Sequence, residues 1–174
     1  GLGGVGLAAL LGAHAAGARQ IVAIDRLDEK LERAYALGAT HAFNADDPDL
    51  VAQVKAATNG GVEYAIEAAS SVDALEVAYR ITRRGGTTVT CSLPHPDHRF
   101  NLQAVNLVAE ERTIKGCYLG SAVPARDIPH YIALYRAGKL PVDKLITSRI
   151  SLDEINAGFD RLAAGEAVRQ VIVF

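Results

Sequence analysis

Glycines open the sequence in the spacing G-x-G-x-x-G, with Gly1, Gly3 and Gly6 at the fixed positions. Such a turn lets the backbone approach a pyrophosphate closely, and the helix that follows directs free N–H groups and a partial positive charge toward it. Asp25 ends an apolar run about twenty residues later, where a carboxylate can accept hydrogen bonds from a ribose. The turn and Asp25 together predict a dinucleotide-binding site.

The choice between the two nicotinamide dinucleotides depends on Asp25. A ribose with two free hydroxyls gives this carboxylate charge-assisted hydrogen bonds, whereas a 2′-phosphate would meet a like charge. The neighbouring Arg26 could soften that repulsion, but we expect its side chain to lie along the adenine ring. The sequence therefore favours NAD over NADP.

The elements that must position these residues alternate between strand-like and helix-like patterns. The predicted strands are 21–24, 41–44, 62–69, 87–91 and 113–119. The predicted helices are 7–16, 27–37, one that begins at Asp47 and Pro48, and one capped by Ser71 that runs to residue 81. Residues 101–110 carry both loop and helix signals. This alternation predicts an α/β protein of the Rossmann type, with a doubly wound parallel sheet.

One strand is missing from this pattern. The glycine turn of a βαβ unit follows a strand that lies in the centre of the sheet, and no residue precedes Gly1. We therefore expect a sheet that lacks its first strand, in a piece of a larger protein. Unpaired backbone groups beside a missing central strand should prevent the chain from folding alone as a monomer with an empty central slot. We expect that the chain is part of a longer polypeptide, that another segment fills the gap, or that the strands rearrange.

The pattern changes after Gly120. Helices are expected at 124–137 and 151–164, the second with a capping box formed by Ser151 and Glu154, and a strand at 168–174. We predict a nucleotide-binding domain over residues 1–119, truncated at its N-terminus, and a segment 120–174 that returns to a second domain.

Composition excludes several classes of partner. The net charge of −2 gives no electrostatic basis for binding nucleic acid or a membrane surface. No apolar run is long enough to predict a transmembrane helix. We expect a cytoplasmic protein.

The remaining candidate groups favour structural roles. The isolated Cys91 and Cys117 are expected to be buried free thiols. His95 and His98 lie with Asp97 in a proline-containing loop that fits a surface turn better than a metal site. Glu67 is expected to be a buried carboxylate with hydrogen-bond partners rather than a catalytic group.

Several motifs in one order resemble a known family across almost the whole chain. They are Gly1–Gly6, Ile24-Asp25, Leu37–Thr40, Gly60–Tyr64, Glu67, Ile114–Gly116, Glu154–Asp160, Gly165-Glu166 and Arg169. The chain resembles the C-terminal, NAD-binding half of the zinc-type medium-chain alcohol dehydrogenases. The resemblance implies that the segment 120–174 belongs to the catalytic domain of that family.

The resemblance also implies a set of cofactor contacts. Gly1, Gly3, Gly4 and Gly6 would hold the pyrophosphate, with Val5 behind the nicotinamide. Asp25 and Lys30 would contact the adenosine ribose, and Arg169 would pair with the pyrophosphate. The other implied contacts are Ala68 and Ala69 beside the cofactor, and the backbone of Leu93, Cys117 and Leu119 at the nicotinamide carboxamide.

The implied activity is a reversible hydride transfer between an alcohol and NAD at a zinc ion. The family's zinc ligands precede the glycine motif, so we expect no catalytic residue and no metal ligand in this chain, zinc only in the full-length protein, and an inactive fragment. The resemblance implies a small alcohol or aldehyde substrate and a homo-oligomer, a dimer or tetramer that pairs through the edge near residues 100–102 and 113–119.

Two alternatives stay open from the sequence. One is a zinc-free reductase of the quinone oxidoreductase kind, and the other is a non-catalytic module for NAD binding or oligomerisation. Two positions depart from some members of the family. Ser71 replaces an arginine that lies against the adenine, and Leu119 replaces an aromatic residue.

Overall fold

The structure is a computed structural model that describes residues 1–174 and has an α/β fold. Its strands are all parallel: β1 (Val22–Asp25) with β2 (His41–Asn44), then β3 (Val62–Glu67), β4 (Thr82–Thr90) and β5 (Thr113–Gly116), and separately β6 (Ser148–Ile150) with β7 (Gln170–Ile172). The helices are α1 (Gly4–Ala15), α2 (Asp28–Ala36), α3 (Leu50–Ala57), α4 (Val72–Ile81), α5 (Ala104–Ala109), α6 (Pro124–Arg136) and α7 (Ile155–Ala163). The Rossmann-type alternation predicted from the sequence is confirmed through β5.

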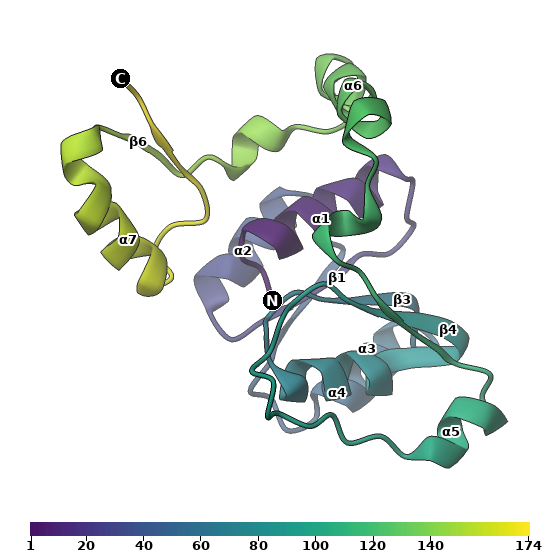
Figure 1. The fold of residues 1–174 in the computed structure, drawn as a ribbon. Helices are drawn as coiled ribbons and strands as arrows, with labels where there is room; N and C mark the ends of the chain where they lie inside the picture. Colours follow the sequence, from purple (N-terminus) through teal and green to yellow (C-terminus); the bar gives the residue numbers. More distant parts are fainter.

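Helices cover both faces of the strands, as a doubly wound fold requires. Figure 1 shows α1 and α2 above the strands and α3 and α4 below them. Each face has its own apolar cluster. The upper one is centred on Leu7 and Leu11 of α1, and the lower one joins Val54 of α3 to Ile81 of α4. The two clusters hold the strand ends, and therefore the loops after them, in fixed positions.

The β1–β2 sheet and the β3–β4–β5 sheet meet at the glycine turn. β1 and β3 form no ladder with each other. The Gly1 nitrogen donates to the carbonyl oxygen of Ile24 at 2.9 Å, and a Cβ atom built on Gly1 would lie 2.8 Å from the Cβ atom of Ala69. Gly1 therefore lies between the carboxyl ends of β1 and β3, which is where the sheet order predicts the turn.

Several element boundaries differ from the prediction. The helix expected to begin at Asp47 and Pro48 begins at Leu50 instead. The carboxylate of Asp47 accepts the N–H of Asp49 at 2.8 Å, and this local turn delays the helix. At the other boundaries, α1 begins at Gly4 rather than residue 7, and β5 ends at Gly116 rather than residue 119.

Strand β4 also begins earlier than predicted, at Thr82 rather than residue 87. Its register with β3 shifts between the pair Val62–Thr82 and the pair Tyr64–Thr87, so the glycines 85 and 86 lie within an irregular part of the strand. Both predicted caps are confirmed: Ser71 Oγ accepts the N–H of Ala74 at 3.5 Å, and the N–H of Ser151 donates to the Glu154 carboxylate at 2.8 Å. The undecided stretch 101–110 contains the short helix α5.

The last part of the chain packs less tightly than the rest. Leu140 and Leu145 join the upper apolar cluster, and Ile150 and Gly158 hold β6 against α7. Figure 1 shows the unit formed by β6, β7 and α7 standing apart from the main sheet. The apolar side chains exposed on α6 include Ile128, Tyr131, Ile132 and Tyr135. None of the helices has the length and apolar character needed to cross a lipid bilayer.

Candidate dinucleotide site

The glycine turn leads directly into α1. Gly3 is the N-cap residue in an extended conformation, and no side chain caps the first N–H groups of the helix. A Cβ atom built on Gly6 would overlap the carbonyl oxygen of Gly1. Only glycine allows this close approach of backbone to backbone. The turn therefore leaves the positive end of α1 open at the carboxyl edge of the strands.

Asp25 fixes the turn as well as closing β1. One carboxylate oxygen accepts the N–H of Leu2 at 2.7 Å, and the other accepts the N–H of Leu27 at 3.1 Å. Each oxygen keeps a further lone pair that could accept a hydroxyl. The contact with Leu2 was not predicted from the sequence, because nothing local to Asp25 indicates it.

Arg26 points away from the turn. Its Nε donates to the carboxylate of Asp46 at 3.0 Å, beyond the end of β2, and both side chains are largely exposed. The predicted position along an adenine ring stays a prediction, and reaching it would require the side chain to leave Asp46.

Two basic residues connect the C-terminal segment to the first two helices. The Arg169 guanidinium lies so close to Gly4 that a Cβ atom there would be 2.9 Å from its Nη2. Lys30 of α2 approaches Gly165, where a built Cβ atom would lie 3.9 Å from Nζ. The structure therefore brings Arg169 to the glycine turn, as a pyrophosphate contact requires.

The remaining predicted residues lie where β3, β4 and β5 end. Ala68 and Ala69 follow β3 next to Gly6 and Gly1. Leu93 follows β4 and is 75% exposed, and Leu119 follows β5 and is 84% exposed with a left-handed φ of 49°. Cys117 is half-buried, and Val5 is exposed in the first turn of α1. All of them share the carboxyl edge of the parallel strands, where ligands bind in open α/β sheets.

Glu67 connects the loops at this edge through hydrogen bonds. Its side chain is 4% exposed, and its carboxylate accepts the N–H of Ala69 at 2.6 Å and the hydroxyl of Thr90 at 2.7 Å. Ser92 donates a third hydrogen bond. Burial by itself would raise the pKa of Glu67, but these donors outweigh it and lower the pKa. The predicted role as a buried, hydrogen-bonded carboxylate is confirmed.

Comparison with known proteins agrees with this geometry. Residues 4–137 match the sequence profile of the family described as "Zinc-binding dehydrogenase". The chain belongs to the zinc-binding dehydrogenase family. It is 39% identical to alcohol dehydrogenase 1 of Oryza sativa subsp. indica, over 99% of this chain and 46% of that protein.

A second curated relative and a solved structure match a similar share of the chain. Geraniol dehydrogenase of Castellaniella defragrans is 39% identical, over 99% of this chain and 46% of that protein. The crystal structure of benzyl alcohol dehydrogenase from Acinetobacter calcoaceticus superposes with a TM-score of 0.95 at 34% identity, covering 99% of this chain and 47% of that one. This chain thus spans about half the length of the relatives it matches.

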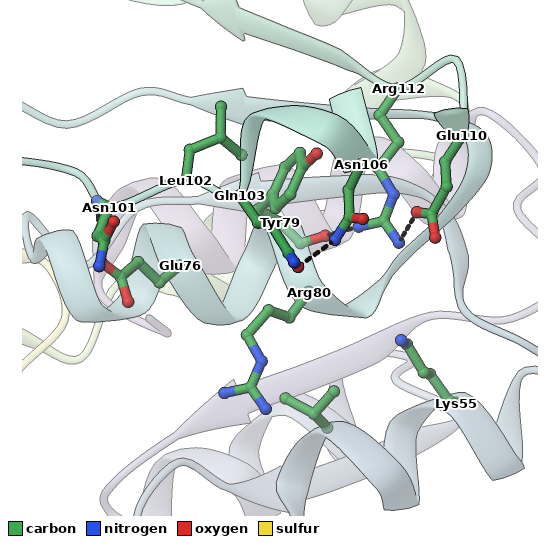
Figure 2. A pocket seen from close by; sticks show the side chains of 11 residues that line it. Lys55, Glu76, Tyr79, Arg80, Asn101, Leu102, Gln103, Asn106, Glu110 and Arg112 are labelled. Atoms are coloured by element: carbon green, nitrogen blue, oxygen red, sulfur yellow. Dashed lines mark hydrogen bonds and ion pairs between the residues drawn. The ribbon is translucent and has the colours of Figure 1, made fainter. Parts of the chain in front are cut away.

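A cavity lies away from the glycine turn, near the start of β5. The cavity lies between α3, α4 and α5 and has a volume of about 600 Å³. Figure 2 shows the side chains that line it, among them Lys55, Arg80 and Arg112. Arg112, which directly precedes β5, is 7% exposed there, pairs with Glu110 at 2.5 Å and lies 4.8 Å from the ring centre of Tyr79. Its Nη1 donates to the carbonyl oxygen of Tyr79 at 2.5 Å. These contacts hold the α5–β5 connection against α4.

The histidine loop forms the surface turn predicted for it. His95 and His98 have ring centres 5.5 Å apart, and the N–H of Asp97 donates to Nδ1 of His95 at 3.3 Å. All three residues are exposed. No group of three or more His, Cys, Asp or Glu side chains in the chain has an arrangement that could hold a metal ion.

Proposed function

We propose that this chain is the coenzyme-binding part of an NAD-dependent alcohol dehydrogenase of the zinc type. The observation that carries the proposal is the meeting of the glycine turn, Asp25 and Arg169 at the open end of α1. The close approaches at Gly1 and Gly6 make a cradle that Cβ atoms would fill, and such a cradle fits a pyrophosphate.

Each part of the dinucleotide has candidate partners at this edge. The N–H groups of the turn and the guanidinium fork of Arg169 suit phosphate oxygens. The free lone pairs of Asp25 suit the ribose hydroxyls. The Nζ of Lys30 lies near Gly165, in the same C-terminal segment as Arg169, and would be the second ribose partner. Arg26 would join the site only by leaving Asp46.

The nicotinamide would lie over the ends of the central strands. Bound NAD supplies the carbon that accepts or returns the hydride. Val5 would lie behind the ring, with Ala68 and Ala69 beside the cofactor, while the backbone of Leu93, Cys117 and Leu119 would orient the carboxamide. The hydrogen bonds of Glu67 to Ala69 and Ser92 support this arrangement, because they fix two of the loops involved.

The rest of the activity would come from residues outside this chain. We assign the zinc ligands and the catalytic groups to the other half of the full-length protein, and no step of the reaction to a metal held by the residues described above. The substrate would be a small alcohol or aldehyde. Residues 1–119 would form the NAD-binding domain, and residues 120–174 would pack on the catalytic domain, which the exposed apolar side chains of α6 support.

The assembly and location follow from the same proposal. β5 is an edge strand of its sheet, so two copies could pair there to form a homo-oligomer. A cytoplasmic location is part of the proposal. The family match does not favour the zinc-free reductase or the non-catalytic module.

Calorimetric titration of NAD and NADP into the full-length protein and its Asp25→Asn variant tests the proposal. Loss of the ribose contact should weaken NAD binding by about ten- to a hundredfold. The substitution also disturbs the contacts with Leu2 and Leu27, but that disturbance weakens both cofactors alike. The ratio of the two affinities therefore isolates the ribose contact.

The matched control is Asp153→Asn, which removes an exposed carboxylate from the turn before α7 and leaves β1 and the Arg26–Asp46 pair intact. It should leave the NAD/NADP ratio nearly unchanged. An unchanged ratio in Asp25→Asn, or no NAD binding by the wild-type protein, would contradict the proposal.

A further inference from the structure

The two cysteines of the chain meet at the ends of neighbouring strands. The β4–β5 register pairs Thr90 with Gly116, and the N–H of Cys117 donates to the carbonyl oxygen of Thr90 at 2.9 Å. The ladder thus continues one residue past both strands and sets Cys91 opposite Cys117. Parallel neighbours in register stand about 4.8 Å apart and point to the same face of the sheet.

The side chains around Cys91 agree with this orientation. Thr90 and Ser92 both donate hydroxyl hydrogen bonds to Glu67, so they occupy one face. Cys91 lies between them in the sequence and must point to the other face, because alternate residues of an extended chain point to opposite faces. That face is the one Cys117 occupies.

The two thiols are free and follow neighbouring strands in register. Both residues are half-buried. Burial first, and then the adjacent thiol of Cys117, raise the pKa of Cys91. The hydroxyl of Ser121 donates to the sulfur of Cys117 at 3.6 Å, so a donor is already in place to stabilise negative charge on that sulfur. The pair therefore has an attacking thiol, Cys117, and a resolving thiol, Cys91.

We propose that Cys91 and Cys117 form a dithiol modification site that closes into an intrachain disulfide when it meets a small disulfide oxidant such as glutathione disulfide. The spacing of neighbouring strands falls inside the range of Cα separations found in disulfides, about 4.4–6.8 Å. The sequence separation of the two cysteines gave no indication of this pairing.

The reaction is an ordinary thiol–disulfide exchange. The Cys117 thiolate attacks one sulfur of glutathione disulfide, forms a mixed disulfide and releases one glutathione thiolate. The Cys91 thiolate then attacks the sulfur of Cys117 and releases the second glutathione. Two protein thiols are oxidised, one glutathione disulfide is reduced to two glutathiones, and the two protons from the cysteines end on the released thiols.

Closure should act on cofactor binding, and this part of the inference rests on the proposed function. The backbone of Cys117 is a proposed partner of the nicotinamide carboxamide, and a covalent bond to Cys91 would constrain the loop that carries it. Loss of one such hydrogen bond corresponds to about a tenfold weaker affinity for NAD. By linkage, saturating NAD should slow or oppose closure.

Mass spectrometry of the full-length protein after exposure to glutathione disulfide tests the inference. We expect the wild-type protein to lose two hydrogens, with a peptide that links Cys91 to Cys117 and no stable glutathione adduct. Cys91→Ser, which keeps the attacking thiol and loses the resolving one, should instead hold one glutathione on Cys117. A wild-type protein in which these two cysteines stay unmodified, or each carry a glutathione, would overturn the inference.

A titration with NAD separates this inference from the proposed function. If the disulfide forms and the oxidised protein binds NAD about tenfold more weakly than the reduced one, both stand. If the disulfide forms but neither state binds NAD, the modification site stands and the proposed function fails. If Cys91→Ser binds NAD normally and the wild type does not close, only the modification site fails.

Discussion

Each edge of the β3–β4–β5 sheet buries one charged side chain. The two side chains hold different parts of the protein in place. At the carboxyl edge, Glu67 accepts hydrogen bonds from the loops that follow β3 and β4. At the amino edge, Arg112 binds Glu110 and the backbone of Tyr79, and so joins the α5–β5 connection to α4. Glu67 positions loops that carry candidate site residues, whereas Arg112 positions helices that carry none.

The comparison also shows why cavity size is a poor guide to the site here. The cavity of about 600 Å³ lies at the amino edge, beside Arg112, Tyr79 and Asn106. No residue of the glycine turn lines it. The carboxyl edge instead has exposed backbone, glycines that admit no Cβ atom, and the guanidinium of Arg169, which are the groups that suit an elongated anionic cofactor.

The largest expected effect comes from adding a side chain inside the glycine turn at the carboxyl edge. In Gly6→Ala, the new Cβ atom would overlap the carbonyl oxygen of Gly1, so the turn must open. We expect NAD affinity to fall by more than about a hundredfold and the free energy of unfolding to fall by about 1–3 kcal/mol. Calorimetric titration and urea unfolding measure the two effects.

Gly12→Ala is the control for the same helix. A Cβ atom on Gly12 meets nothing within 4 Å, and alanine in a helix interior is more favourable than glycine by about 1 kcal/mol. This variant should be slightly more stable and bind NAD normally. Equal losses of NAD affinity in Gly6→Ala and Gly12→Ala would refute the claim that the turn itself is the site.

The next largest effect distinguishes the amino edge of the sheet from the carboxyl edge. Arg112→Met removes the partner of Glu110 and the donor to Tyr79, and leaves a largely buried carboxylate without its cation. We expect the free energy of unfolding to fall by about 3 kcal/mol, with little change in NAD affinity. Urea unfolding and calorimetric titration check the two parts.

Arg26→Met is the matched control, because its ion pair with Asp46 is exposed and should contribute less than about 1 kcal/mol. If Arg112→Met lost as much free energy of NAD binding as free energy of unfolding, the amino edge would belong to the site. The contrast between the two edges of the sheet would then be wrong.

The smallest of the three effects sharpens the role of Glu67. Glu67→Gln keeps the shape of the side chain but replaces one acceptor with an amide, so at least one of the donors Ala69, Thr90 and Ser92 loses its partner. We expect a loss of about 1–3 kcal/mol in the free energy of unfolding. NAD affinity should fall as well, since the loops that carry Ala69 and Leu93 are released.

Acidification supplies an independent readout for Glu67. Its pKa is lowered in the folded state, so its contribution to stability is fully present above the ordinary value of 4.5 and is lost as the pH falls through the folded pKa. Below about pH 4.5, the free energy of unfolding of the wild-type protein should therefore fall more steeply with decreasing pH than that of Glu67→Gln. Parallel pH profiles would contradict the assignment.

Local chemistry was readable from the sequence because it depends on neighbours in the chain. The strand 41–44 and the caps at Ser71 and Ser151 match the structure, since strand propensity and capping depend on residues that are close together in the chain. The errors at Asp47 and at the start of β4 are local too. There, a side-chain hydrogen bond and an irregular register compete with the simpler pattern.

The kind of chemistry and the order of the elements could be read from the residues alone: a glycine turn before a helix, and an acidic residue after the next strand. Which distant residues meet became known only from the folded chain. Folding brought Arg169 to Gly4, tied Asp25 to Leu2, and set Cys91 beside Cys117. The physical reason is that periodicity and capping act over a few residues, whereas these contacts depend on the sheet order and on how the C-terminal segment returns to α1.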